Sequence, residues 1–173
     1  MQTSEAELIA RSINHDTDAY GQLVERYKHA LYRHCFALMR DEDVAEDIAQ
    51  DSFITAYYKL STFDPSRRFS TWLFKIATNK SLNTLKANRH VVRMNEATIA
   101  QLASSNSSPI EQAKNTELHQ LIEQLEPRYR AVVHLYYFEG LSYEEIAVVM
   151  AKPVGSIKGW LHRAKTQLRK ELV

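Results

Sequence analysis

Residues 140–165 read GLSYEEIAVVMAKPVGSIKGWLHRAK, and this stretch predicts two short helices joined by a tight turn. Ser142 and Glu145 form an S-x-x-E capping box, a pattern that marks the start of a helix. Pro153 cannot continue that helix, because proline has no amide hydrogen to donate. Residues 157–170 then repeat apolar side chains at helical spacing, and residues 154–170 contain five basic and no acidic residues. We therefore predict a helix-turn-helix with a basic second helix.

The second helix of such a motif enters the DNA major groove, and the side chains opposite its apolar stripe contact DNA. Arg163 is suited to a bidentate contact with guanine, whereas Lys158 and Lys165 are suited to phosphates. The predicted readers are Ser156, Lys158, Gly159, Trp160, His162, Arg163, Lys165 and Arg169. The alternative interpretation is an ordinary solvated cationic helix.

The rest of the chain also favours helices, since it contains only four glycines and four prolines. The predicted N-caps of the earlier helices are Ser4, Asp16, Asp41 and Ser70. The polar run ASSNSSP at residues 103–109 resists regular structure and predicts a linker. The predicted fold class is all-α: two small helical domains, residues 1–93 and 111–173, joined by a flexible linker at 94–110.

Charge is arranged in blocks, although the net charge is only +1. Residues 41–51 contain six acids and no base, whereas residues 61–93 contain seven bases and one acid. With the basic residues at 154–170, these blocks predict two DNA contacts and one basic protein partner. An apolar stripe on residues 41–60 faces a core and leaves the other side to Asp43, Glu46, Asp47, Gln50 and Ile54.

The composition argues against an enzyme. The seven histidines form no His-Glu-x-x-His or His-x-x-x-Cys-x-x-Cys pattern and there is no glycine-rich phosphate loop, so we expect neither a metal nor another cofactor. Cys35 is the only cysteine, and we expect it to be a small core residue. The chain shows no signal peptide and no apolar run of membrane-spanning length, which predicts a soluble cytoplasmic protein.

Four motifs in this order resemble the extracytoplasmic-function (group four) sigma factors of the housekeeping-sigma superfamily: DEDVAEDIAQDSFITAYYKL, FSTWLFKIATNKSLN, GLSYEEIAVVM and PVGSIKGWLHRAK. The resemblance covers nearly the whole chain. It implies an alternative sigma factor that binds core RNA polymerase and directs promoter-specific initiation by reading the minus-ten and minus-thirty-five elements. The implied partners are the clamp helices and flap of the polymerase, duplex promoter DNA, the melted nontemplate strand, and an anti-sigma factor.

The resemblance also implies roles for individual residues in the first domain. Phe63 and Asn79 match positions that help to form a pocket for a flipped base. The implied minus-ten set is Ser61, Thr62, Phe63, Asp64, Arg67, Arg68, Trp72, Lys75, Asn79, Lys80, Asn83 and Lys86. The implied polymerase-binding set is Asp43, Glu46, Asp47, Gln50, Asp51 and Ile54. The second domain, residues 111–173, would read the minus-thirty-five element through the helix-turn-helix.

Gly159 and Trp160 depart from the family pattern, in which serine and arginine are common at these positions. The departure puts the specificity of minus-thirty-five reading in doubt, and a glycine inside a helix costs about 1 kcal/mol relative to alanine. An alternative function is a helix-turn-helix regulator that binds duplex DNA without joining polymerase. That alternative does not explain the acidic segment or the basic aromatic stretch of the first half.

Overall fold

A computed structural model describes the protein over residues 3–95 and 116–172, and every regular element in these two ranges is helical. The N-terminal half consists of α1 (Glu5–Ile13), α2 (Thr17–Met39), α3 (Glu42–Lys59), the 3-10 turn η1 (Leu60–Thr62) and α4 (Phe69–Asn95). The C-terminal half consists of α5 (Thr116–Gln124), α6 (Pro127–Val133), the π-helical segment η2 (His134–Phe138), α7 (Tyr143–Met150) and α8 (Val154–Glu171). The all-α prediction is confirmed for the described residues. The predicted linker at 94–110 begins inside α4 and lies outside the described residues from residue 96 onward.

Side-chain caps explain where the first three helices begin. Ser4, Asp16 and Asp41 each accept a hydrogen bond from the backbone amide three residues later, at 3.2, 3.0 and 2.9 Å. The same prediction for Ser70 was wrong. Helix α4 begins at Phe69, so Ser70 lies in its first turn, where it is buried.

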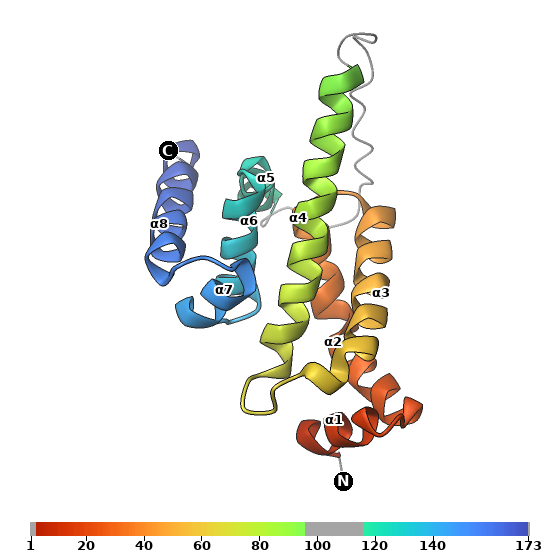
Figure 1. Ribbon diagram of the computed structural model, residues 1–173. Coiled ribbons are helices and arrows are strands. Elements are labelled where there is room, and N and C mark those ends of the chain that lie inside the picture. The colour runs from red at the N-terminus through yellow and green to blue at the C-terminus, as the bar shows by residue number, and fades with distance from the viewer. Residues whose placement is uncertain (1–2, 96–115, 173) are drawn as a thin grey trace.

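Helix α2 is the centre of the N-terminal half and contacts α1, α3 and α4 (Figure 1). The apolar stripe that the sequence predicts on residues 41–60 is buried against it. The hydroxyl of Tyr20 on α2 donates a 2.6 Å hydrogen bond to the carbonyl of Phe53, which ties α3 to α2. Cys35 is fully buried on α2, and burial raises the pKa of its thiol to about 12.

The predicted helix-turn-helix is present as α7 and α8. Both bonds of the capping box form: the amide of Glu145 donates to Ser142 Oγ at 3.1 Å, and the amide of Ser142 donates to the Glu145 carboxylate at 2.8 Å. Helix α7 ends at Ala151, which adopts a left-handed conformation, and α8 begins directly after Pro153. The second helix therefore starts three residues before the predicted start at residue 157.

The two halves pack against each other, with α7 on α4 and with α6 and η2 on α2 (Figure 1). Arg130 of α6 is buried in this contact. Its guanidinium donates to the carbonyls of Ala37 and Leu38 in the last turn of α2, at 2.9 and 2.8 Å. It also donates to the carbonyls of Glu123 and Leu125 at the end of α5, at 3.1 and 2.6 Å. One cation thus satisfies the free carbonyls of two helix ends, one from each half.

A pair of buried imidazoles lies next to this contact. His34 of α2 places Nε2 2.7 Å from Thr78 Oγ1 of α4, and its ring centroid lies 5.4 Å from that of His134 in η2. Burial holds the pKa of His34 well below its usual value, and His134 adds to the effect. Burial, aided by the positive charge of Arg33, lowers the pKa of His134 to about 4. Both rings are therefore neutral at neutral pH.

We expect acid to destabilise the protein through His134. A histidine with a lowered folded-state pKa binds its proton more readily in the unfolded state. Its contribution to the free energy of unfolding is therefore complete above about pH 6.5 and is lost as the pH falls toward 4. The free energy of unfolding should fall by about 2 kcal/mol between pH 7 and pH 5. Urea unfolding at both values, for the wild type and His134→Gln, measures it. The other charged groups at this site, Arg33 and Glu139, remain in both proteins, so equal pH dependence would contradict the prediction.

Candidate nucleic-acid interface

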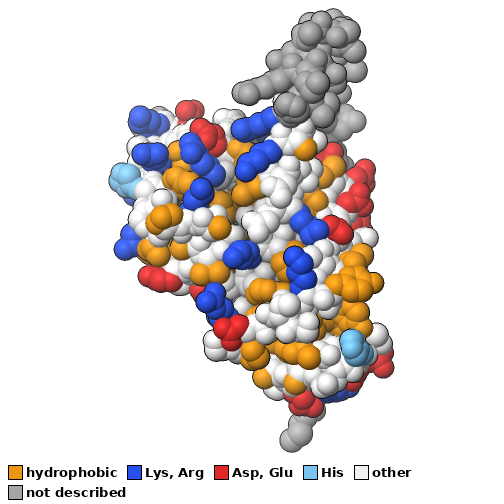
Figure 2. All heavy atoms as spheres, viewed as in Figure 1, with side chains coloured by type: hydrophobic (Ala, Val, Ile, Leu, Met, Phe, Trp, Pro, Cys, Tyr) orange, Lys and Arg blue, Asp and Glu red, His pale blue; other side chains and the backbone are white. Residues whose placement is uncertain are grey.

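Helix α8 carries an open depression on the side away from its buried stripe. His162, Arg163, Thr166, Gln167 and Lys170 line it. The first two belong to the predicted DNA readers, and the other three do not. They lie one and two turns further along the same face, and helical periodicity alone would have found them. Figure 2 shows lysine and arginine side chains spread over the viewed face of the molecule, and a group of acidic side chains on the edge where α3 lies, with other acids scattered elsewhere.

Two predicted phosphate contacts on α8 have other neighbours in the folded chain. The ammonium of Lys165 lies 5.6 Å from the ring centre of Tyr137, and the phenol raises the pKa of the lysine. The ammonium of Lys158 lies 5.8 Å from the ring centre of Tyr143. Arg169 lies with Lys165 beside an apolar groove, not in the depression. Both lysines lie close enough to an aromatic ring for a cation–π interaction, Lys158 with α7 and Lys165 with η2.

Gly159 and Trp160, the two residues of α8 that depart from the family pattern, have different surroundings. A β-carbon at Gly159 would meet no atom within 4 Å among the described residues, so no contact within the protein requires glycine there. Trp160 is half-buried and lies 5.8 Å from the Arg128 guanidinium, which also covers the ring of Tyr129. The tryptophan therefore holds α8 to the start of α6, and it does so with an aromatic–cation contact.

The implied minus-ten residues belong to η1, to the loop that follows it and to α4. Phe63 is buried against Phe69 and Trp72, at ring distances of 5.6 and 5.2 Å. Asp64 accepts bonds from the amide and hydroxyl of Ser66, which lower its pKa and hold the loop. Most of the remaining members are exposed: Ser61, Thr62, Arg67, Arg68, Asn79, Asn83 and Lys86. Lys75 is half-buried, as are Trp72 and Lys80.

Besides the pair of Arg67 with Asp64 inside the loop, at 3.7 Å, two of these bases are paired with acids of other helices. Arg68 Nη1 lies 3.0 Å from Glu145 Oε1 of α7, and the hydroxyl of Thr71 lies 3.4 Å from the same oxygen. Lys80 forms an ion pair with Asp51 of α3. The pair of Arg68 with Glu145 joins the two halves of the chain, because Glu145 belongs to the helix-turn-helix.

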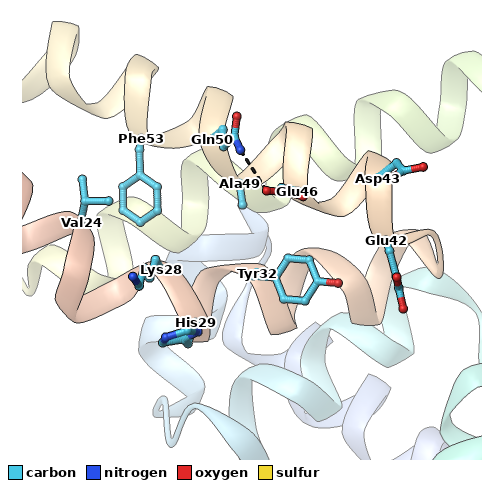
Figure 3. Close-up of a pocket in the computed structure, with 10 residues that line it drawn as sticks. All are labelled: Val24, Lys28, His29, Tyr32, Glu42, Asp43, Glu46, Ala49, Gln50 and Phe53. Carbon is cyan, nitrogen blue, oxygen red and sulfur yellow. Dashed lines mark hydrogen bonds between the residues drawn. The ribbon is translucent and has the colours of Figure 1, made fainter. Parts of the chain in front are cut away.

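The acidic side of α3 faces a hollow of about 490 Å³ between α2 and α3 (Figure 3). Asp43, Glu46 and Gln50 line it, and the Gln50 amide donates to Glu46 Oε1 at 3.2 Å. Its other walls are apolar, aromatic or cationic: Val24, Lys28, His29, Tyr32, Ala49 and Phe53, with Glu42 at one end. Of the other predicted members, Asp47 and Asp51 line a separate depression beside Lys80 and Asn83 of α4. Ile54 is 56 % exposed.

An apolar groove in the C-terminal half was not predicted from the sequence. It runs between α5, η2 and α8 and is lined by Leu118, Ile122, Val133, Tyr137, Phe138, Leu168 and Leu172, with Lys165 and Arg169 at its rim. Four of these side chains are large, hydrophobic and 41–53 % exposed: Leu118, Tyr137, Phe138 and Leu172. Exposed apolar residues that adjoin one another in a groove are typical of a protein-binding site. The sequence did not indicate the groove, because Leu168 has the spacing of the buried stripe of α8 and was therefore interpreted as a core residue.

The described residues contain no cluster of three histidine, cysteine or acidic side chains suited to a metal ion. Over the same ranges, none of the helices combines the length and the apolar character needed to cross a membrane.

Comparison with known proteins gives a consistent result for both halves. Residues 23–91 match the family described as Sigma-70 region 2, and residues 115–168 match Sigma-70, region 4. The chain is 34 % identical over 170 residues to the ECF RNA polymerase sigma factor SigW of Bacillus subtilis (strain 168), covering 91 % of this chain and 90 % of the relative.

Two solved structures share the fold. The first is CnrH in complex with the cytosolic domain of CnrY, which is 28 % identical with a TM-score of 0.72 and covers 97 % of this chain and 96 % of that one. The second is the sigma factor RpoE from Bartonella quintana in complex with the anti-sigma factor NepR, which is 22 % identical with a TM-score of 0.74. That alignment covers 88 % of this chain and 96 % of the other.

Replacing Gly159 with alanine should stabilise the protein by about 0.5–1 kcal/mol, because alanine is the better helix former and its methyl group meets no neighbour. Urea unfolding of Gly159→Ala against the wild type measures the change. Gly155→Ala is the matched control: it is equally free of neighbours but lies in the first turn of α8, where the gain should be smaller. A destabilised Gly159→Ala protein would count against the open surroundings described for this residue.

Proposed function

The chain belongs to the extracytoplasmic-function RNA polymerase sigma factors, and on that premise we propose which of its surfaces meets each partner. As a member of this family it binds core RNA polymerase and directs promoter-specific initiation through the minus-ten and minus-thirty-five elements. One observation carries the assignment of surfaces: basic residues recur along α4 and along α8, whereas residues 41–51, at the start of α3, contain six acids and no base. DNA is attracted by basic surfaces and a basic protein by an acidic one, so these surfaces suit partners of opposite charge.

Helix α8 would read the minus-thirty-five element from the major groove. The exposed depression around Arg163 supports this role, because it presents one guanidinium together with hydroxyl, amide and imidazole groups. Lys158, Ser156 and Gly159 lie near the N-terminal end of α8, where phosphates approach a helix favourably. Lys165 and Arg169 would contact the flanking backbone from the rim of the apolar groove, and Trp160 would act by holding α8 on α6.

The loop before α4 and the outer side of α4 would hold the minus-ten element. Single-stranded bases are bound by aromatic faces and a cationic track, and this surface offers both. Phe63, packed under Trp72, would form the floor of a pocket for a flipped base, and the exposed Asn79 would read its edge. Asn83 and Lys86 continue the exposed side of α4, where they would follow the strand.

The hollow on α2 and α3 would receive the clamp helices of the largest polymerase subunit. Its three acids attract a basic partner, and its aromatic walls offer apolar area to a helix that enters. Asp47, Asp51 and Ile54 would contact the same partner from the edge of this face. The apolar groove on α5, η2 and α8 would receive the flap, since a groove with exposed leucine and aromatic side chains suits an apolar helix.

We also propose an anti-sigma factor as a partner, because both similar solved structures are complexes, CnrH with the cytosolic domain of CnrY and RpoE with the anti-sigma factor NepR. The hollow and the groove are the surfaces that such a protein would cover. Catalysis of RNA synthesis would belong to the polymerase and not to this chain, and the place of action would be the cytoplasm, where the polymerase works.

Reconstituted transcription tests the function directly. Purified protein and core polymerase are incubated with a genomic fragment library, and transcript starts are mapped by sequencing. We expect starts that depend on the protein and share two spaced promoter elements. Stable binding to core without dependent starts would contradict independent promoter recognition. Binding to duplex DNA without binding to core would support the regulator alternative instead.

Two substitutions on α8 should separate base reading from phosphate binding. Arg163→Ala should weaken the preferred promoter about tenfold or more and remove the preference at one base position, because a bidentate contact contributes about 1–3 kcal/mol of discrimination. Lys158→Ala should weaken all promoters about equally and reduce the slope of log affinity against log salt by about 1. Competition among promoter variants at several salt concentrations measures both. Identical selectivity in the two variants would remove Arg163 from the base-reading role.

A further inference from the structure

We propose that Tyr58 of α3 is a further contact for the nontemplate strand and stacks on one unpaired base of the melted minus-ten element. The inference rests on the proposed function, because only a melted promoter offers such a base. Tyr58 belongs to none of the residue sets predicted from the sequence. The residue is 79 % exposed, which is the highest value among the large hydrophobic residues that the structure describes. With Ile54 one turn earlier it forms an exposed apolar strip at the end of α3.

The ring of Tyr58 is anchored on one side and open to a planar ligand. Its centroid lies 5.8 Å from that of Tyr57, and the two rings are inclined by 72°. Tyr57 in turn lies 4.9 Å from Tyr20, whose hydroxyl is bonded to the carbonyl of Phe53. Because Tyr57 is nearly perpendicular to Tyr58, it does not stack on it, and the exposed ring keeps a face free for a base. An anchored aromatic ring loses little conformational freedom when it binds.

Tyr58 lies on the side of α3 that adjoins the proposed minus-ten residues. Asp51 precedes it by seven residues, which is two helical turns along the same face. Asp51 forms an ion pair with Lys80 of α4, and α3 and α4 lie side by side (Figure 1). In the other direction along the chain, the exposed residues Ser61 and Thr62 of η1 follow within about one turn. Tyr58 therefore adjoins both the η1 part and the α4 part of the surface proposed for the minus-ten element.

Charge favours DNA over a polymerase helix as the partner of Tyr58. The acids of α3 end at Asp51, and residues 52–63 contain no acid and one base, Lys59. Acids attract a basic protein and repel phosphates, so the part of α3 beyond Asp51 is the part that a DNA strand can approach. The hydroxyl of Thr62 donates to the carbonyl of Lys59 at 2.6 Å, which ties η1 to the end of α3. An exposed aromatic ring next to an exposed lysine is the combination that binds single strands.

Fluorescence of 2-aminopurine tests the contact in the holoenzyme, the full chain bound to core polymerase. A promoter mapped by transcription is prepared with a mismatched bubble over the minus-ten element, and 2-aminopurine replaces each nontemplate base of the bubble in turn. Tyr58→Ala should raise the fluorescence at one position above the wild-type value, because the base there loses its stacking partner. Tyr58→Phe should keep the wild-type value, since stacking needs the ring and not the hydroxyl.

Affinity for the bubble promoter is the second measurement. Tyr58→Ala should weaken binding of the holoenzyme about 5- to 150-fold without changing the slope of log affinity against log salt, because a stacked ring releases no counterion. Two matched controls separate the other kinds of contact. Lys86→Ala, on the exposed side of α4, should reduce that slope by about 0.7 and leave the fluorescence unchanged. Ile54→Ala, on the same strip as Tyr58, should weaken binding to core polymerase and leave the fluorescence of the assembled holoenzyme unchanged.

Unchanged fluorescence at every bubble position in Tyr58→Ala would overturn the proposal. So would a Tyr58→Ala protein that behaves like Ile54→Ala, with weaker binding to core and an unchanged fluorescence pattern, because Tyr58 would then contact polymerase. If the wild type directs no dependent transcription, the proposed function fails and the stacking role fails with it. Dependent transcription together with unchanged fluorescence would overturn the stacking role alone. Urea unfolding of the free chain should give the same stability for wild type and Tyr58→Ala, since the ring is exposed.

Discussion

A buried guanidinium must find acceptors for its donors, and in this protein Arg130 finds them at the ends of two helices. The last carbonyls of a helix have no partners within it and carry the negative end of the helix dipole. Arg130 donates hydrogen bonds to such carbonyls at the end of α2 and at the end of α5. Burial lowers the pKa of Arg130 only to about 10, so the side chain remains charged at neutral pH. Arg130 thus ties the end of α2 to the turn before α6, and the contact of His34 with His134 joins the same two halves.

The distribution of charge explains how a nearly neutral chain serves partners of opposite sign. A net charge of +1 gives no long-range preference for nucleic acid. Acids concentrated on α3 and bases on α4 and α8 create separate local potentials, each suited to a different partner. The packing of the two halves couples two of these surfaces, because Glu145 of one half pairs with Arg68 of the other. Charge segregation therefore provides both surfaces for partners and ion pairs between the halves.

Local rules predicted much of this fold from the sequence. The N-caps at Asp16 and Asp41, the capping box at Ser142 and the break at Pro153 depend only on neighbouring residues, and the structure contains all four. Arg130 and the histidine pair could not be predicted in this way. They are polar residues whose burial depends on partners more than 90 residues away, and a single sequence records no such pairing. The apolar groove was missed for a similar reason, since Leu118 and Leu172 complete it from opposite ends of the C-terminal half.

Within this chain, Cys35 lies in the core of the N-terminal half with a thiol pKa of about 12. Oxidants react with the thiolate, and almost none is present at a pKa so far above neutrality. The chain thus has no cysteine of its own that peroxide or a disulfide would modify while it is folded. A thiol-based response of transcription to oxidative stress would therefore need a reactive cysteine in another protein, and it would reach this chain as a change in what binds it.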